Sequence, residues 1–235
     1  MSLPPSLTAW LQQLAQKLQP LDSRPRVTLA YAQSLNGCLS AQEGEQTLIG
    51  GETTRVFAHR LRTLHEGILV GVNTILVDDP QLNVRHVQGS SPRPIVVDSQ
   101  LRTPPTARVL TAEKTPWIAT APNADPRRAA ALEQAGAQIL PTPQDEHGRL
   151  NLKQLFVELA RRGLHSLMIE GGAQIITSVL QQRLADQAAV TIAPCWLAGA
   201  QLTVAAPPLQ LLEPNWHIVG EDSILTGEIT LDAST

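Results

Sequence analysis

Cysteine and long apolar runs are scarce in this chain. The two cysteines, Cys38 and Cys195, lie far apart and have no CxxC partner, which argues against a disulfide framework and a thiolate zinc site. No run of about 18 apolar residues occurs. The first residues, MSLPPSLTAWLQQLAQ, also lack the basic start and apolar stretch of a signal peptide. We therefore expect a soluble, cytoplasmic protein without a membrane span.

Basic runs and aromatic residues are scarce as well. The chain has 18 Lys and Arg residues against 21 Asp and Glu, a formal charge of −3, and no basic cluster that could follow nucleic-acid phosphates. Nucleic acid is thus not expected as a partner, whereas a few arginines can still bind a small phosphorylated ligand. Aromatic residues make up 3% of the chain, so the core must be mainly aliphatic.

From Arg26 onward, short apolar runs alternate with segments of helical periodicity. The pattern predicts strands at 26–34, 67–72, 94–98, 116–120, 137–140 and 166–170, and helices at 52–66, 127–136, 151–163 and 173–184. This repeated β-then-α order predicts an α/β fold, with a predominantly parallel central sheet flanked by helices. Apolar runs at 187–194 and 216–231, the second broken by a polar turn at 220–223, predict an antiparallel C-terminal hairpin.

The first 24 residues precede this pattern. Ser6 can cap a helix, and Pro20 follows the end of that helix. Apolar residues recur in it at helical spacing: Leu7, Trp10, Leu11, Leu14 and Leu18. We expect residues 1–24 to form an amphipathic helix and residues 25–235 to form a single domain. The apolar stripe could cover that domain or a second subunit, and packing within the chain is favoured.

Three strand ends carry candidate chemistry. The segment MIEGGAQ (168–174) passes from a strand through an acid and two glycines directly into a helix, which favours an anion, although a tight βα turn would also explain it. After the strand at 67–72, a polar loop holds a hydroxyl, two carboxylates and an arginine, where open α/β sheets bind ligands. The strand at 26–34 runs into Asn36-Gly37, which a hairpin turn alone would explain.

Together these segments resemble the reductase domain of bifunctional riboflavin-biosynthesis proteins and their stand-alone relatives, a family with the dihydrofolate-reductase-like fold. The resemblance runs from about Arg26 onward, and several motifs share its order and spacing. They are SLNG (34–37), LR (61–62), ILVGVNTILVDDPQLNVR (68–85), PIVVDSQLRTP (94–104), IEGGAQ (169–174) and IAP (192–194).

The resemblance implies an NADPH-dependent oxidoreductase that converts the ribosyl side chain of a 5-phosphoribosylamino-pyrimidine to a ribityl chain. A hydride would pass directly from nicotinamide C4 to ribose C1, and no metal is needed. The zinc deaminase domain of the bifunctional relatives is not expected, because Pro194-Cys195-Trp196-Leu197-Ala198 lacks the second cysteine of PCxxC. Members are commonly homodimers. Trp196 and Trp216 are candidates for such an interface, although core positions are favoured for both.

The same resemblance implies the site residues. Those for the cofactor are Ala32, Leu48, Thr74, Asp78, Ser99, Arg102, Gly171, Gly172, Ala173 and Gln174. Those for the substrate are Gln46, Arg62, Leu82, Arg85 and Glu170. Asp78 and Glu170 are the candidate catalytic residues: Asp78 would assist proton movement or orient the carboxamide, and Glu170 would accept hydrogen bonds from the substrate. Ser99 and Arg102 are candidates for the 2′-phosphate.

Three positions depart from the bacterial bifunctional pattern, which usually has lysine at Ala30, aspartate at Asn36 and tryptophan at Leu48. Ala30 leaves open whether the pyrimidine is the deaminated or the diamino form, and the three positions together leave open whether the chain is active. The preference for NADPH or NADH is also open. One alternative is an NADPH reductase of a pterin or another carbonyl compound on the same scaffold. Another is a nucleotide-binding paralogue without catalytic activity.

Overall fold

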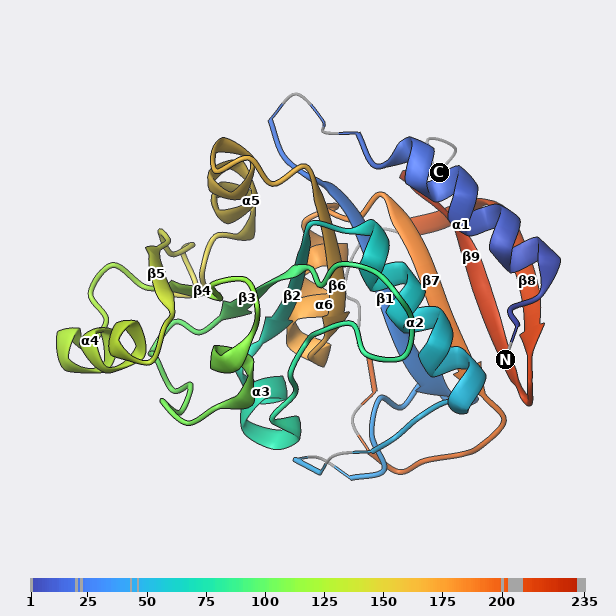
Figure 1. Cartoon of the computed structure of the whole chain (residues 1–235), viewed down its shortest axis with the longest axis horizontal. Helices are drawn as coiled ribbons and strands as arrows, with labels where there is room; N and C mark the ends of the chain where they lie inside the picture. The colour runs from blue at the N-terminus through green and yellow to red at the C-terminus, as the bar shows by residue number, and fades with distance from the viewer. Residues whose placement is uncertain are drawn as a thin grey trace.

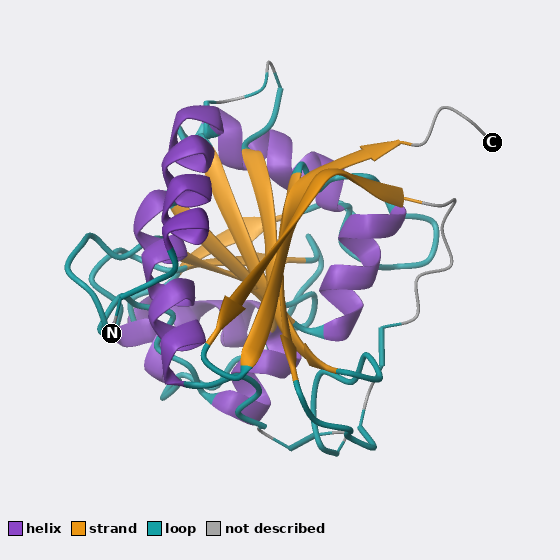
Figure 2. Cartoon of the chain, turned by 90° about the vertical axis from the view of Figure 1, so that its right-hand side faces the viewer, coloured by secondary structure: helices purple, strands orange, loops and turns teal. Residues whose placement is uncertain are grey.

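The computed structural model describes residues 2–19, 21, 23–42, 44–45, 47–199, 201–202 and 209–231. Within these residues it forms one sheet with helices on both faces (Figures 1 and 2). The strands are β1 (Arg26–Ser34), β2 (Gly67–Gly71), β3 (Arg93–Val97), β4 (Trp117–Thr120), β5 (Gln138–Pro141), β6 (Ser166–Gly171), β7 (Gln187–Ala193), β8 (Leu209–Val219) and β9 (Asp222–Leu231). The helices are α1 (Pro5–Lys17), α2 (Glu52–Leu64), α3 (Val72–Asp78), α4 (Pro126–Gln134), α5 (Leu152–Arg161), α6 (Ala173–Gln181) and the short 3₁₀ helix η1 (Arg108–Thr111).

The strand order is β5-β4-β3-β2-β6-β1-β7-β9-β8. Every pair from β5 to β7 is parallel, and β9 is antiparallel to both β7 and β8. This order confirms the predicted parallel sheet with an antiparallel C-terminal hairpin. The first hairpin strand, β8, is longer than predicted and begins at Leu209.

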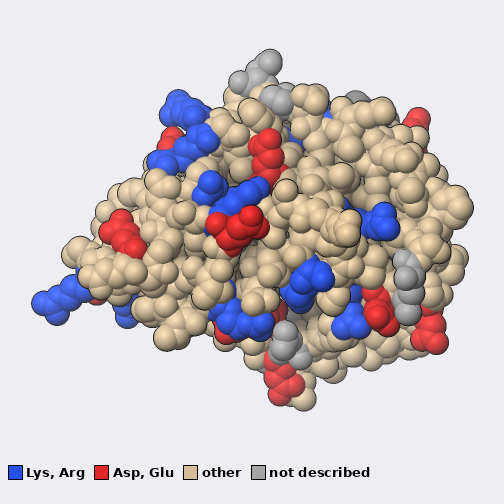
Figure 3. All heavy atoms as spheres, viewed as in Figure 1, with Lys and Arg blue, Asp and Glu red and all other residues tan. Residues whose placement is uncertain are grey.

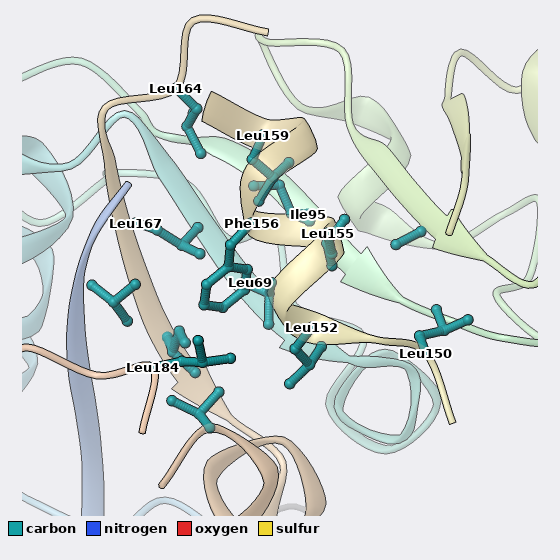
Figure 4. Packing of buried hydrophobic residues seen from close by; sticks show 14 of the residues in the cluster. Leu69, Ile95, Leu150, Leu152, Leu155, Phe156, Leu159, Leu164, Leu167 and Leu184 are labelled. Carbon is teal, nitrogen blue, oxygen red and sulfur yellow. The ribbon is translucent and has the colours of Figure 1, made fainter. Parts of the chain in front are cut away.

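Aliphatic clusters fill the space between the sheet and its helices. On one face α5 and α6 pack on the central strands, where Phe156 and Leu159 meet Leu69, Ile95 and Leu167 (Figure 4). On the other face the apolar residues of α1 and α2 form a second cluster, and those of α3 and α4 form a third. At about 25 cal/mol per Å² of buried apolar surface, these clusters are the main source of stability.

Helix α1 packs within the chain, as its apolar stripe predicts. Trp10 lies with its ring centroid 6.2 Å from that of Phe57 in α2. The prediction that Ser6 caps the helix is wrong, since α1 begins at Pro5, whose ring fixes φ for the first helical position. Ser6 Oγ instead lies 2.9 Å from Nδ1 of His217 in β8 and so joins the helix to the hairpin.

Two other predictions are corrected by the structure. The segment after β2 is not only a polar loop, because residues 72–78 form α3, which buries Val72 and Ile75. Core positions for Trp196 and Trp216 are wrong too, since their side chains are 75% and 60% exposed. Strand β8 lies at the sheet edge and turns alternate residues to solvent. None of the described helices is both long and apolar enough to cross a membrane.

Candidate active site

The site lies where the chain leaves two neighbouring strands in opposite directions. Strand β2 continues to β3 through α3 on one face of the sheet, whereas its neighbour β6 continues to β7 through α6 on the other. Such a point leaves a crevice at the carboxyl ends of parallel strands. Gly71 ends β2 and Gly171 ends β6. The topology therefore brings two of the three predicted segments side by side.

A β-bulge gives Glu170 its position. Leu69 of β2 pairs with Ile169 of β6, but the next pair joins Val70 to Gly171, so Glu170 is the extra residue. Bulges of this kind redirect a side chain at the end of a strand. The carboxylate of Glu170 meets the guanidinium of Arg62 from α2, with Nε–Oε1 and Nη2–Oε2 distances of 2.5 Å each.

The pair formed by Arg62 and Glu170 is largely buried. Its side chains are 12% and 17% exposed, and Arg62 Nη1 also donates to the carbonyl oxygen of Asn83 at 2.7 Å. A two-pronged contact of this type fixes orientation as well as charge. The two predicted substrate residues are therefore held as one unit, and the unit also anchors the loop that follows α3.

Cationic side chains surround this pair. Burial and then the charges of Arg62, Arg108 and Arg55 lower the pKa of Arg85, whereas Glu170 raises it. The charges that act on Arg85 are thus three guanidinium groups and one carboxylate, so positive charge is in excess around it. Guanidinium forks match phosphate oxygens, so this cluster suits a phosphorylated ligand. On the face drawn in Figure 3, basic and acidic side chains are interspersed.

His59 holds the backbone of this cluster. Its Nδ1 accepts the backbone N–H of Arg85 at 3.1 Å. Burial first, and then the charges of Arg62, Arg85 and His86, lower the pKa of His59 to about 3. The ring is therefore neutral at physiological pH and remains a hydrogen-bond acceptor. We assign His59 to positioning the loop that carries Arg85.

A cleft of about 150 Å³ lies between α2 and strands β1, β6 and β7. Ala32 and Glu170 line it, together with Arg55, and Ala30 contributes part of the apolar wall. The predicted cofactor residue Leu48 does not line this cleft: its side chain is 69% exposed, and its neighbour Ile49 lines the wall instead.

The C-terminal hairpin fixes the start of α2. Asp222 Oδ2 accepts from the backbone N–H of Gly51 at 2.7 Å and from Thr54 Oγ1 at 2.8 Å. Gly50 has φ +89°, and a Cβ there would lie 2.8 Å from Thr54 Oγ1. Because α2 carries Arg55 and Arg62, the hairpin sets the position of the cationic side chains.

Gly171, which ends β6, and Gly172, which follows it, leave space for a ligand beside α3. Gly172 has φ +88°, and a Cβ on Gly171 or Gly172 would lie 3.5 Å from Thr74 Oγ1. Helix α6 starts at the next residue, Ala173, with no side-chain cap, so its first amides can face a ligand. Close backbone approach at a helix N-terminus suits a pyrophosphate. These residues fit a nicotinamide dinucleotide.

Ser99 and Arg102 follow the next strand, β3. Arg102 is exposed, and its Nη2 donates to Asn73 Oδ1 in α3 at 2.9 Å. Asp98 shapes this loop, because its Oδ2 accepts from the N–H and the hydroxyl of Thr103 at 2.7 Å each. Neighbouring strands lie about 4.8 Å apart, so the ends of β6, β2 and β3 offer a row of positions along which a dinucleotide can extend.

Two neighbouring carboxylates at the end of α3 differ in their surroundings. Asp79, at φ 39°, accepts the backbone N–H of Arg108 at 2.8 Å through Oδ1 and so joins α3 to η1. Asp78 is half-buried and forms no ion pair within the described part of the chain. Burial raises the pKa of Asp78 above the usual aspartate value. Asp78 is therefore the carboxyl group better suited to hold a proton.

Three other residues expected at the site differ in where the structure places them. Gln46 lies outside the described residues. Leu82 is 2% exposed and packs in the cluster beneath α3, so only its backbone can meet a ligand. Gln174 is exposed in the first turn of α6. Sequence reasoning missed Arg55 and Arg108. Arg55 precedes Arg62 by seven residues, about two helical turns, which was a usable signal.

The departure at Asn36 has a structural explanation. Its Oδ1 accepts from Ser34 Oγ at 2.7 Å and from the N–H of Leu197 at 3.1 Å. Its Nδ2 donates to the carbonyl oxygen of Leu197 at 2.8 Å. An aspartate cannot donate this last hydrogen bond. Asn36 thus joins the loop after β1 to the loop after β7.

Comparison with known proteins identifies the family. Residues 25–225 match the model described as the RibD C-terminal domain. The chain belongs to this family. This chain is 34% identical to a 2,5-diamino-6-ribosylamino-4(3H)-pyrimidinone 5′-phosphate reductase from Debaryomyces hansenii. The alignment covers 97% of this chain and 98% of that relative. A protein of that name from Methanothermobacter thermautotrophicus is 36% identical over 75% of the chain and 81% of its own length.

Solved structures agree with this assignment. The riboflavin biosynthesis reductase of Saccharomyces cerevisiae superimposes on the RibD-type chain with a TM-score of 0.76 at 26% identity, covering 94% of this chain and 99% of the yeast protein. A dihydrofolate reductase from Enterococcus faecalis, 13% identical, has a TM-score of 0.50 over 86% of this chain and 96% of its own, and shares the fold alone. The predicted family and the dihydrofolate-reductase-like fold are confirmed.

Proposed function

We propose that this chain is an NADPH-dependent reductase of riboflavin biosynthesis, and that it acts on 2,5-diamino-6-ribosylamino-4(3H)-pyrimidinone 5′-phosphate. The observation that carries the proposal is the buried Arg62–Glu170 unit, which lies beside further arginines at the end of β6, directly before Gly171 and Gly172. Relatives that this chain spans almost end to end carry that substrate in their names, which favours the diamino form. Residues 25–235 form the reductase domain, and the helix within residues 1–24 packs on it.

In this proposal the two ligands occupy different parts of the site. Gly171, Gly172 and the start of α6 receive the pyrophosphate of the cofactor, next to Thr74. Arg102 is exposed beside α3 and available to a 2′-phosphate, which favours NADPH over NADH. Arg85 offers its guanidinium to the 5′-phosphate of the substrate. Glu170, held by Arg62, accepts hydrogen bonds from substrate hydroxyl or amino groups.

The chain itself positions the reactants and manages one proton. When bound, NADPH supplies a hydride from nicotinamide C4 to C1 of the ribosyl chain, which has opened to an imine. The reduction also requires a proton at the nitrogen that joins C1 to the pyrimidine. Asp78 holds this proton and delivers it through water, because its raised pKa keeps more of the protonated form than a solvated aspartate would. Glu170, paired with Arg62, stays available as an acceptor.

The direct test follows the loss of NADPH absorbance with the diamino pyrimidinone 5′-phosphate as substrate. We expect turnover with NADPH, a lower kcat/KM with NADH, and little turnover with dihydrofolate. Turnover with dihydrofolate at a comparable kcat/KM would reassign the site to a pterin. Binding of NADPH without oxidation in the presence of the pyrimidine would instead favour a nucleotide-binding paralogue.

The pKa of Asp78 predicts a pH-dependent change in stability. Because the folded-state pKa is raised, the folded protein binds this proton more tightly than the unfolded chain does. The stabilisation is complete below the unfolded pKa and is lost as pH rises through the folded pKa. Asp78→Asn should therefore raise Tm relative to the parent at pH 7, but not near pH 4, while lowering kcat. A Tm difference that does not change with pH would contradict this cause.

The exposed side of the C-terminal hairpin is the interface that we propose for a homodimer. Trp216 and Ile218 are 60% and 68% exposed on β8, whereas α1 covers the opposite side of the hairpin. Large exposed apolar side chains at a sheet edge favour pairing with a second copy. We expect light scattering to give twice the monomer mass, and Trp216→Asp to give the monomer mass. Trp196→Asp, in the loop after β7, is the matched control and should remain dimeric.

A further inference from the structure

Arg55 is a cation that the proposed binding scheme leaves without a ligand. It lies in the first turn of α2, and its Nε is buried and has no hydrogen-bond partner among the described residues. A buried donor of this kind costs about 1–3 kcal/mol unless a partner satisfies it. Native proteins keep few such groups, and a water molecule, an ion or a ligand can supply the missing partner.

The carboxylate in the same cleft does not supply that partner. Arg55 and Glu170 both line the cleft, but the hydrogen bonds of Glu170 run to the fork of Arg62, at 2.5 Å each, and not to Arg55 Nε. Among the described residues Arg55 forms no ion pair, and its charge is one of those that lower the pKa of Arg85. The guanidinium of Arg55 therefore has donors to offer to a ligand.

The walls of the cleft indicate which part of the ligand Arg55 meets. Most of them are small or apolar side chains: Ala30, Ala32, Leu61, Met168 and Ala189. Arg85 and Arg108 do not line the cleft, and Arg55 is the weakest of the arginine influences on Arg85. Arg55 and Glu170 are the charged side chains of this mostly apolar lining, and Tyr31, Thr54 and Thr191 add hydroxyl groups. A narrow space of this kind suits a flat heterocycle with polar edges better than a phosphate.

We propose that Arg55 donates hydrogen bonds to an oxygen at the edge of the substrate's heterocycle, and that it is a specificity residue for that ring. This inference rests on the proposed function. Arg55 donates to an acceptor atom of the ring and Glu170 accepts from a donor group, so the two side chains together distinguish the edges of the ring. Asp222 and Thr54, which fix the first turn of α2, keep Arg55 in place.

The test compares two ligands in the presence of NADP⁺, so that no turnover occurs. One is the diamino pyrimidinone 5′-phosphate, and the other is ribose 5-phosphate, which has the sugar and the phosphate but no heterocycle. Arg55→Gln should weaken binding of the first about tenfold or more, as expected for a lost charged hydrogen bond, and binding of the second less than twofold. Arg85→Gln is the matched control and should weaken both equally.

Arg55→Lys keeps the positive charge but not the guanidinium fork. Its affinity for the diamino pyrimidinone 5′-phosphate should lie between those of the parent and Arg55→Gln. Circular dichroism and Tm establish that each variant is folded. If Arg55→Gln unfolds, Arg55→Lys, which retains the charge, takes its place in the comparison. Equal weakening of both ligands by Arg55→Gln would place Arg55 at the phosphate and overturn the inference, as would no weakening of either. If the parent protein binds the pyrimidine no better than ribose 5-phosphate, the proposed function itself fails.

Discussion

Replacing Glu170 by glutamine is expected to lower kcat/KM by about 100-fold and the free energy of unfolding by about 3 kcal/mol. The change preserves shape but removes the charge opposite Arg62, whose side chain is only 12% exposed. A guanidinium in that position then lacks its counter-ion, and the loop bonded through Asn83 loses its anchor. Steady-state kinetics and denaturant unfolding measure the two effects on the same preparation.

The chain offers a matched control in Glu158, which forms an exposed pair with Arg162 in α5. Its side chain is 38% exposed, so Glu158→Gln should cost no more than about 0.5 kcal/mol and leave kcat/KM unchanged. If Glu170→Gln behaves like Glu158→Gln, the pair formed by Arg62 and Glu170 is neither a structural anchor nor part of the site.

Replacing Gly172 by alanine is expected to raise the Kd for NADPH by about tenfold or more and to cost about 1–2 kcal/mol of stability. The backbone at Gly172 has φ +88°, and a Cβ there would project towards Thr74 Oγ1 at 3.5 Å. The methyl group both strains the backbone and occupies the space through which the pyrophosphate must approach. Fluorescence titration with NADPH measures the change.

A substitution at Gly163 separates backbone strain from the blocked approach of the pyrophosphate. This glycine has φ +81°, and a Cβ there would meet nothing within 4 Å, because it lies in the turn after α5. Gly163→Ala should therefore carry a similar cost in stability with no effect on the Kd for NADPH. If Gly172→Ala leaves the Kd for NADPH unchanged, the cofactor does not bind at this junction.

The sequence predicted those parts of the fold and site that local patterns encode. Alternating apolar runs and helical periods predict the parallel sheet, and Gly171-Gly172 after an apolar strand predicts an anion site at the start of α6. Helix α3 was missed because seven residues are too few for a helical period to stand out. The exposure of Trp216 was missed because composition favours burial of tryptophan, whereas its place on an edge strand follows only from strand order.

The contacts that orient the site depend on residues far apart in the chain. Asp222 holds the start of α2 from 171 positions away, and Glu170 meets Arg62 across 108 positions. The bulge that aims Glu170 is a matter of register between β2 and β6. No local pattern encodes such pairings, so the resemblance could supply Arg62 and Glu170 as separate residues but not the buried unit that they form.

The proposed function requires that this site transfers a hydride from NADPH to C1 of the ribosyl chain. The measurement uses NADPH that carries deuterium at both hydrogen positions of nicotinamide C4, with the diamino pyrimidinone 5′-phosphate as substrate and mass spectrometry of the product. We expect a single deuterium at C1 of a ribityl chain. A reduced product without deuterium at C1, or deuterium elsewhere in the molecule, would contradict it.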